Sequence, residues 1–176
     1  MAELLEKTVA LAAHDYDLRK KYDFREIRIV REFEDDLPEV ACMPTEIEQV
    51  MLNLLRNASQ AFRAMDQMPA APQIVLRLQR EGRFVRIEVE DNGPGIPADA
   101  LPRLFEPFFT TRPNGLGIGL AICRRIVEAH GGRIWAESQV GRGTTVSFAL
   151  PPLSDPHPEA STTPEHIEAA APGTDL

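Results

Sequence analysis

The chain has 176 residues, 43% of them hydrophobic and 26% charged, a balance typical of one folded domain and too short for two ordinary ones. No apolar run approaches the roughly 18 residues that span a bilayer, so we expect no direct membrane insertion. The net charge of −8 argues against a surface for nucleic acid.

Periodicity divides the first half of the chain into two helices and two strands. Residues 1–6 are acidic and unlike a targeting sequence, so we expect an internal start, within a helix that covers 3–13. Alternation predicts a strand over 26–34, and a short buried strand is expected over 39–43. Segment 45–48 forms a capping box that should begin a long helix. That helix has one apolar stripe, made of Ile47, Val50, Met51, Leu54, Leu55, Ala58, Ala61 and Phe62.

The second half of the chain favours hairpins. Segments 73–79 and 84–90 alternate at period two and predict one hairpin. A helix follows over 120–130, stopped by a glycine pair, and 133–137 and 144–150 are two closing strands. We therefore predict an α+β fold: a two-layer α/β sandwich whose mixed, mostly antiparallel sheet is covered on one face by about three helices.

The end of the chain differs in composition. Residues 153–176 are rich in Pro, Ala, Ser and Thr and hold five acidic residues but no Lys or Arg. Such a segment buries too little apolar surface to offset its ordering entropy, so we expect a disordered acidic tail after a domain over 1–152. The two cysteines, Cys42 and Cys123, lack metal-ligand spacing and are expected to be buried thiols in a reducing cytosol.

Polar amides follow the edge of the apolar stripe in the long helix. Asn53, Asn57 and Gln60 are four and three residues apart and share one stripe. A solvated helix face is the ordinary alternative. Amide carbonyl oxygens at the edge of a core can also bind Mg²⁺, which is often held by few protein ligands together with substrate phosphates.

An acidic residue follows the strand 84–90 and precedes two glycines. Asp91, Gly93 and Gly95 make an ordinary turn if taken alone. The functional interpretation is that Asp91 accepts a hydrogen bond from an exocyclic amino group and so selects adenine over guanine. The glycines then allow the backbone to approach the base.

Three glycines precede the helix 120–130. Gly115, Gly117 and Gly119 leave backbone N–H groups open to an anion at a helix N-terminus. The pattern lacks the lysine of a P-loop and the third glycine of a dinucleotide fingerprint. The polar segment 110–114 between these glycines and the phenylalanines before it is suited to a lid.

Four motifs therefore occur in order, at 53–57, 91–95, 105–111 and 115–120. Together they resemble the N, G1, F and G2 boxes of the catalytic and ATP-binding domain of sensor histidine kinases. This domain has the Bergerat fold of the GHKL superfamily, shared with type II topoisomerases, mismatch-repair ATPases and heat-shock chaperones. Segments 126–135 and 143–148 match as well, so the resemblance covers about 1–152. The lid is most similar to PAS-linked and nitrogen-regulation-type kinases.

The resemblance implies a role for each matching residue. Asn57 would hold Mg²⁺ with help from Asn53, Asp91 would bind the adenine amino group, and Thr144 would lie near the base. Gln60 stands where these kinases often have Lys, and Arg112 of the lid could compensate. The other implied ATP-binding residues are Gly93, Gly95, Ile96, Thr110, Thr111, Gly115, Leu116, Gly117, Ile118, Gly119 and Leu120.

The expected activity is transfer of the ATP γ-phosphate to a histidine. The acceptor histidine of these kinases lies in a His-Glu/Asp-x-x-x-Pro pattern. His14 is followed by Asp15 but has no proline at the end of the pattern, so we expect the acceptor on a dimerisation domain that is absent from this chain. A response regulator is the expected downstream partner. We expect the domain to be cytoplasmic, either alone or as the cytosolic part of a membrane-bound sensor.

Three other functions fit parts of the pattern. Chaperone- and topoisomerase-like ATPases resemble this fold but place a water-activating Glu where this chain has Asn53. A serine kinase of the anti-sigma type is less consistent with the segment Phe108–Thr111. A domain that senses nucleotide without transferring phosphate would not need the intact motifs.

Overall fold

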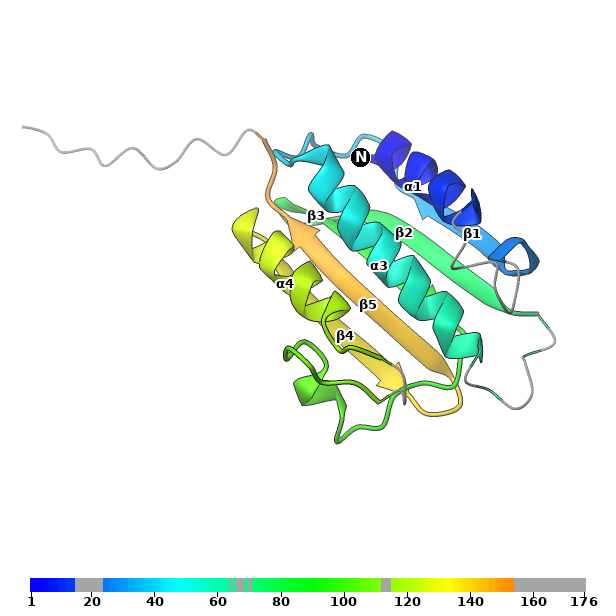
Figure 1. Ribbon diagram of the computed structural model, residues 1–176. Coiled ribbons are helices and arrows are strands. Elements are labelled where there is room, and N and C mark those ends of the chain that lie inside the picture. The colour runs from blue at the N-terminus through cyan, green and yellow to red at the C-terminus, as the bar shows by residue number, and fades with distance from the viewer. Residues whose placement is uncertain (15–23, 64, 66–68, 70, 112–114, 154–176) are drawn as a thin grey trace, which may run out of the picture.

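The computed structural model describes residues 1–14, 24–63, 65, 69, 71–111 and 115–153 (Figure 1). The tail expected over 153–176 lies outside the described residues except for Leu153, and so do residues 112–114 of the expected lid, among them Arg112. None of the helices in the described part of the chain is long and apolar enough to cross a membrane.

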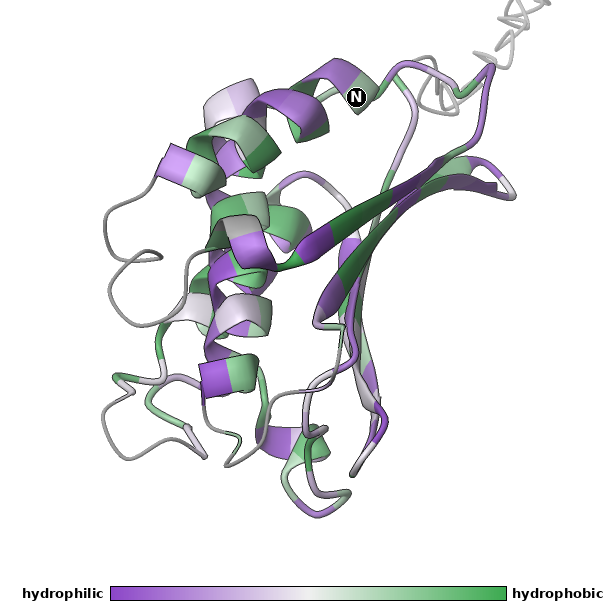
Figure 2. Cartoon of the chain, turned by 90° about the vertical axis from the view of Figure 1, so that its right-hand side faces the viewer, coloured by the Kyte–Doolittle hydropathy of each residue, from purple (hydrophilic) through white to green (hydrophobic). Residues whose placement is uncertain are grey.

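The protein has two layers, as predicted. Helices α1 (Ala2–His14), α3 (Pro44–Arg63) and α4 (Gly119–Ala129) cover one face of a five-stranded sheet. Figure 2 shows the helices stacked on one side and the strands on the other, with α3 between α1 and α4 in Figure 1. The α+β class and the helical cover on a single face are confirmed.

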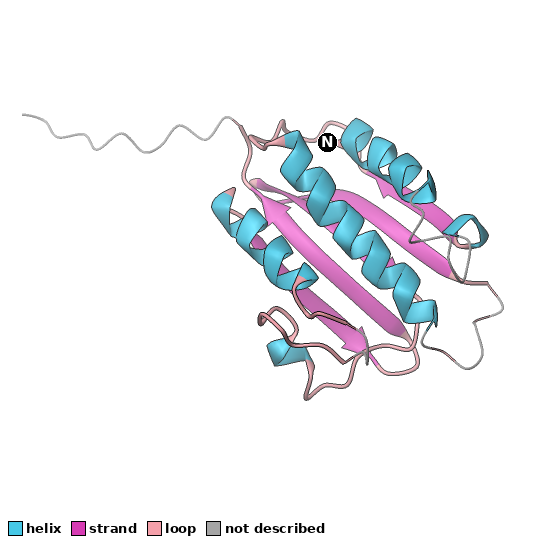
Figure 3. Cartoon of the chain, viewed as in Figure 1, coloured by secondary structure: helices cyan, strands magenta, loops and turns pink. Residues whose placement is uncertain are grey.

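The sheet is mixed and mostly antiparallel (Figure 3). Its strand order is β1-β2-β3-β5-β4, and only β1 and β2 run parallel, because the chain crosses through α3 between them. Two short 3₁₀ turns, η1 (Phe24–Glu26) and η2 (Leu101–Arg103), lie outside the sheet. The strands are β1 (Arg28–Phe33), β2 (Gln73–Glu81), β3 (Phe84–Asp91), β4 (Arg133–Gln139) and β5 (Gly143–Leu150).

The core lies between α3 and the inner face of the sheet. The apolar stripe of α3 is buried because residues three and four apart share one side of a helix. Alternate residues of β2, β3 and β5 meet it, since successive strand side chains point to opposite faces. The largest fully buried side chains are Phe24, Phe62, Phe148, Leu5, Ile47, Met51, Leu54, Leu55, Ile74, Leu76 and Leu78.

The outer face of the sheet has charged residues in place of a second helical layer. Glu88, only 5% exposed, forms ion pairs with Arg77 and Arg86 on either side of it. Trp135 lies within about 5 Å of the guanidinium groups of Arg86 and Arg133. These contacts, some within a strand and some between strands, pair the charges on a face that none of the described helices covers.

The prediction of a short buried strand over 39–43 is wrong. In this segment only Val40 makes a bridge, to Pro152, while the Glu39 carbonyl accepts the Leu153 N–H at 2.6 Å. Pro38 and Pro44 flank the segment, and proline has no N–H to donate to a strand ladder. The preceding strand also begins later than expected, at Arg28, after the turn η1.

The prediction of a capping box at 45–48 is also wrong. A capping box would place Thr45 just before the first helical residue, but the long helix already begins at Pro44. Pro44 occupies the first helical position, which places Thr45 inside the first turn. The helix start is held by another residue: the Met43 N–H donates to His130 Nε2 at 3.1 Å. Because Nε2 accepts the Met43 N–H, Nδ1 is the ring nitrogen that donates, to the Ile126 carbonyl 2.8 Å away. His130 thus joins the end of α4 to the start of α3.

Replacing His130 with Ala should lower the free energy of unfolding by roughly 1–2 kcal/mol, because the α3–α4 junction loses a hydrogen bond and a nearly buried ring. His14→Ala is a matched control. His14 Nδ1 lies at the same 2.8 Å from the carbonyl four residues before it, but the ring is exposed at the end of α1. The control should change stability by less than about 0.5 kcal/mol. Urea unfolding measures both, and equal effects would show that the junction contributes nothing.

Candidate functional site

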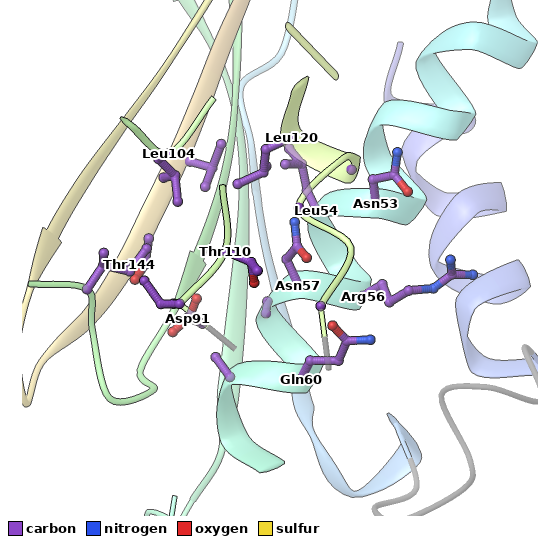
Figure 4. A pocket seen from close by; sticks show the side chains of 18 of the residues that line it. Asn53, Leu54, Arg56, Asn57, Gln60, Asp91, Leu104, Thr110, Leu120 and Thr144 are labelled. Carbon is purple, nitrogen blue, oxygen red and sulfur yellow. The ribbon is translucent and has the colours of Figure 1, made fainter. Parts of the chain in front are cut away.

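A cavity of about 880 Å³ lies between α3, the inner face of β3 and β5, and the loops that precede α4 (Figure 4). This volume lies within the range of small-molecule sites. Its wall is apolar where Val89, Val146 and Leu104 line it, and polar along one edge of α3. A ligand with an apolar ring and a polar, charged end would match this lining.

The amide stripe predicted from the sequence forms that polar edge. Asn53, Asn57 and Gln60 all line the cavity, and Leu54 of the same helix is buried beside them. Figure 4 shows Asn53 and Asn57 on consecutive turns of α3, with Asp91 on the other side of the cavity. The cavity therefore has amides on one wall and a carboxylate on the other.

Asp91 is held in place by the glycine that follows it. Its carboxylate is at the end of β3, the residue is 7% exposed, and Oδ1 accepts the Gly93 N–H at 2.9 Å. A Cβ on Gly93 would lie 2.7 Å from that oxygen and 3.3 Å from Ala61 Cβ. Gly93 is buried and does not line the cavity. Its role is to leave room for the carboxylate, which differs from the expected role in the wall.

The loop after Asp91 rests on the β4–β5 turn. Gly95 has a φ of +75°, and a Cβ there would lie 2.2 Å from the Gln139 carbonyl oxygen. The Gly141 N–H donates to the Pro94 carbonyl at 2.8 Å, and the Ile96 N–H donates to Ser138 Oγ at 2.8 Å. This loop therefore forms the cavity wall with its own backbone, at a position set by the turn.

The glycine-rich segment forms the opposite end of the cavity. Gly117 has a φ of +66°, and a Cβ would lie 2.5 Å from the Phe109 carbonyl oxygen. Its own carbonyl accepts the Phe108 N–H at 2.9 Å. Helix α4 begins at Gly119 after Ile118, which has no polar side chain to cap the first N–H groups. Uncapped N–H groups at a helix start attract an anion.

The rim of the cavity is unusually apolar. Phe108 has a φ of +65° and is 80% exposed, Leu116 is 76% exposed and Ile118 is 38% exposed. The three phenylalanines of the segment 105–111 thus have different environments. Phe105 packs against the core, Phe109 lines the cavity and Phe108 faces outward.

A buried thiol supports the amide wall from behind. Cys123 of α4 is fully buried, and its Sγ donates to the Val50 carbonyl and is hydrogen-bonded to the Asn53 side chain. Burial raises the pKa of Cys123 to about 12. Cys42 is only half-buried, so the expectation of two buried thiols holds for Cys123 alone.

The structure gathers almost every predicted site residue around this one cavity. The exceptions are Gly93, which acts on Asp91, and Arg112, which lies outside the described residues. The expected residues that line it are Asn53, Asn57, Gln60, Asp91, Gly95, Ile96, Thr110, Thr111, Gly115, Leu116, Gly117, Ile118, Gly119, Leu120 and Thr144.

Sequence reasoning missed other residues of the lining. Arg56 and Arg63 line the cavity three and ten residues after Asn53, a helical spacing that would have identified them. Leu104 and Ile122 had no such signal, because their place depends on how the loops fold back over the sheet.

Known proteins are similar to this chain in sequence. Residues 42–154 match the family model of histidine kinase-, DNA gyrase B-, and HSP90-like ATPases. The chain is 44% identical to sensor protein FixL of Bradyrhizobium diazoefficiens over 60% of its own length and 20% of that protein. It is 42% identical to sensor histidine kinase ZraS of Escherichia coli over 72% of its length and 26% of that protein. The chain thus spans about a quarter or less of these relatives.

Solved structures of histidine kinases are also similar to the chain. The catalytic domain of histidine kinase ThkA superposes with a TM-score of 0.69 at 32% identity, covering 86% of this chain and 93% of that domain. Full-length ShkA in complex with AMPPNP has a TM-score of 0.69 at 29% identity, covering 85% of this chain and 29% of that protein.

The two thiols should differ in reactivity. At about pH 8, iodoacetamide should label Cys42 and leave Cys123 unlabelled until the protein unfolds, because burial and a pKa of about 12 keep Cys123 protonated. An unfolded thiol ionises near about pH 8.5, so the contribution of Cys123 to stability is complete below that pH and is lost as pH rises toward 12. Mass spectrometry of timed samples measures the labelling. Equal rates would show that the α3–α4 contact opens readily.

Proposed function

Because this chain belongs to the family of histidine kinase-, DNA gyrase B-, and HSP90-like ATPases, we propose that it is the catalytic and ATP-binding domain of a sensor histidine kinase. It transfers the γ-phosphate of ATP to a histidine on a dimerisation domain that lies outside this chain. The extent of the match supports this, since the chain covers nearly all of the ThkA catalytic domain but only a fraction of full-length relatives. We propose that the domain covers 1–152, and the end of the family match at residue 154 supports this boundary.

The residue at position 53 carries the argument for transfer rather than hydrolysis. A hydrolase needs a base to activate water, and an amide cannot take a proton. Asp91 is the one carboxylate among the described residues that line the cavity, and it is hydrogen-bonded to Gly93 on the wall opposite the amides. An acceptor histidine needs no such base, because it is itself the nucleophile.

The two ends of the cavity match the two ends of ATP. Adenine fits between the apolar wall and Asp91, which would accept a hydrogen bond from its amino group, with Thr144 beside it. The phosphates then reach the start of α4, where backbone N–H groups of Gly117 to Leu120 bind negative charge. Thr110 and Thr111, at the mouth of the cavity, lie where a lid would contact the phosphates.

The amide wall fits a magnesium ion. Among the described residues, no three His, Cys, Asp or Glu side chains gather to hold a metal. The side-chain oxygen of Asn57, with Asn53 one turn away, would complete a coordination sphere otherwise made of phosphate oxygens and water. When bound, such an ion would supply positive charge that neutralises the transferring phosphoryl group. The residues of the chain orient the phosphates around it.

The apolar rim supports a partner that approaches the γ-phosphate. Leu116 and Ile118 line the end of the cavity where the phosphates would lie and are exposed, and the exposed Phe108 is joined to Gly117 of the same end by a backbone hydrogen bond. Exposed apolar groups beside a binding site are typical of a contact surface. We assign this rim to the dimerisation domain, with a response regulator as the next acceptor of the phosphate. All three components act in the cytoplasm.

Hydrolysis of ATP is the second candidate. The family match supports it equally, because the family includes ATPases of other kinds. The two functions differ in the fate of the γ-phosphate, which is measurable.

Asp91→Asn should weaken ATP binding by roughly 1.5–3 kcal/mol, because a carboxylate acceptor for the adenine amino group is replaced by an amide. Asp99→Asn, at an exposed position of the following loop, is the matched control and should leave affinity unchanged. Calorimetry with ATP and with GTP measures the effect. Equal affinities for the two nucleotides in the wild type would contradict the assignment of Asp91.

The isolated chain should hydrolyse ATP very slowly, yet phosphorylate the separate dimerisation domain of its own kinase on histidine. Transfer will be weak, because no tether raises the local concentration of the acceptor. Asn57→Ala should abolish it by removing the metal ligand, whereas Gln79→Ala, an amide on the outer face of β2, should not. Labelled ATP and an acid-lability assay identify phosphohistidine. Brisk release of inorganic phosphate without transfer would instead place the chain among the ATPases.

A further inference from the structure

We propose that Ser138 is a positioning residue that makes Thr144 a hydrogen-bond acceptor and thereby tunes the cavity to a purine with an amino group at position 6. The inference rests on the proposed function, since it concerns how the same cavity recognises the base of ATP. Ser138 lies on β4 behind the wall and does not touch the main cavity in the described lining. Its effect must therefore pass through its neighbours.

The hydroxyl of Ser138 has three polar neighbours. The Ile96 N–H donates to Oγ at 2.8 Å, and Oγ donates to the Gly143 carbonyl at 2.8 Å. Thr144 Oγ1 lies 2.9 Å away, in a contact where either oxygen can be the donor. Ser138 and Thr144 are paired across β4 and β5, so both side chains point to the same face of the sheet.

Counting hydrogens decides the direction of the ambiguous contact. A hydroxyl donates one hydrogen bond and accepts up to two. The Gly143 carbonyl can only accept, so it takes the single hydrogen of Ser138. The Ile96 N–H can only donate, so it occupies one lone pair of Ser138. The remaining partner, Thr144, must then donate to the second lone pair. This arrangement satisfies all four groups, and reversing the Ser138–Thr144 bond would deprive Gly143 of this donor.

Thr144 consequently presents lone pairs, and no hydrogen, to the cavity that it lines. Its register partner across the β3–β5 ladder is Asp91, whose carboxylate is also an acceptor when ionised. Figure 4 shows both side chains at the same end of the cavity. A wall made of acceptors favours a base edge that carries hydrogens and disfavours one that carries a carbonyl oxygen. An amino group at position 6 of the purine satisfies this wall, and an oxo group there does not.

The same hydroxyl also holds the loop that forms the adjoining wall. The contact to the Ile96 N–H joins two others between this loop and the β4–β5 turn, at Gly95 and at Pro94. Loss of one contact out of three loosens the loop and would weaken every nucleotide alike. A purely structural role therefore differs from the proposed one, because only the proposed role changes the preference between bases.

Binding of ATP and inosine triphosphate to the whole chain separates the two roles. Inosine triphosphate has an oxo group in place of the 6-amino group and lacks the 2-amino group of guanine. In Ser138→Ala the hydrogen of Thr144 loses its acceptor and can turn to the cavity. The ratio of ATP affinity to inosine triphosphate affinity should fall about tenfold. Ser138→Thr keeps the hydroxyl and should retain the wild-type ratio. Ser147→Ala, which removes a buried hydroxyl from the outer face of the same sheet, should also retain it.

A double-mutant cycle of Ser138 and Thr144 distinguishes an effect that passes through Thr144 from a general loss of stability in the Ser138 variant. Thr144→Val should lower the ratio by itself, and adding Ser138→Ala should then lower it no further, because Ser138 acts through Thr144. Equal losses for both nucleotides in Ser138→Ala, or an additive cycle, would overturn the proposal. A wild-type chain that binds neither nucleotide would overturn the proposed function itself, a result easily told apart from an unchanged ratio.

Discussion

Burial of the apolar stripe of α3 between α1, α4 and the sheet is the constraint on which the site depends. The helix can bury Leu54 and Leu55 in only one rotation, and that rotation directs Asn53 and Asn57 to the cavity instead of the core. Packing at native density permits little adjustment of this rotation. The amide wall is therefore positioned by hydrophobic contacts made by its own neighbours in the helix, and His130 holds the far end of α3 against α4.

The opposite wall is built from backbone, and its shape depends on missing side chains. A Cβ at Gly93 would displace the carboxylate of Asp91, a Cβ at Gly95 would strike Gln139, and one at Gly143 would lie 1.9 Å from the Asp91 carbonyl oxygen. Three loops can thus approach each other closely at one end of the sheet. This closeness allows a single hydroxyl, that of Ser138, to bond to two of them.

The chemistry of the cavity follows from which groups it contains and from how they are separated. Amides and uncapped helix N–H groups lie at the end of the cavity proposed for the phosphates, and the carboxylate lies at the end proposed for the base. Under this proposal the cavity would bind and orient a nucleotide with its metal, while Asp91 is the one carboxylate in the described lining. The proposed nucleophile is a histidine of another domain, and the exposed apolar residues Phe108, Leu116 and Ile118 are where we propose that this domain makes contact.

The sequence by itself determined the layers, most strands and helices, and the motif residues that line the cavity, because periodicity and short motifs are local properties of the chain. Prediction from the sequence failed where a hydrogen-bond partner is distant along the chain. Local patterns predicted a strand over 39–43 and a capping box at Thr45, and both predictions were wrong. The start of the long helix is instead held by the ring of His130, 87 residues away in the sequence. The pairing of Ile96 with Ser138, 42 residues apart, has no local signature either. Only tertiary packing decides such contacts, because hydrogen-bond partners are selected by the closeness that the folded sheet and helices impose.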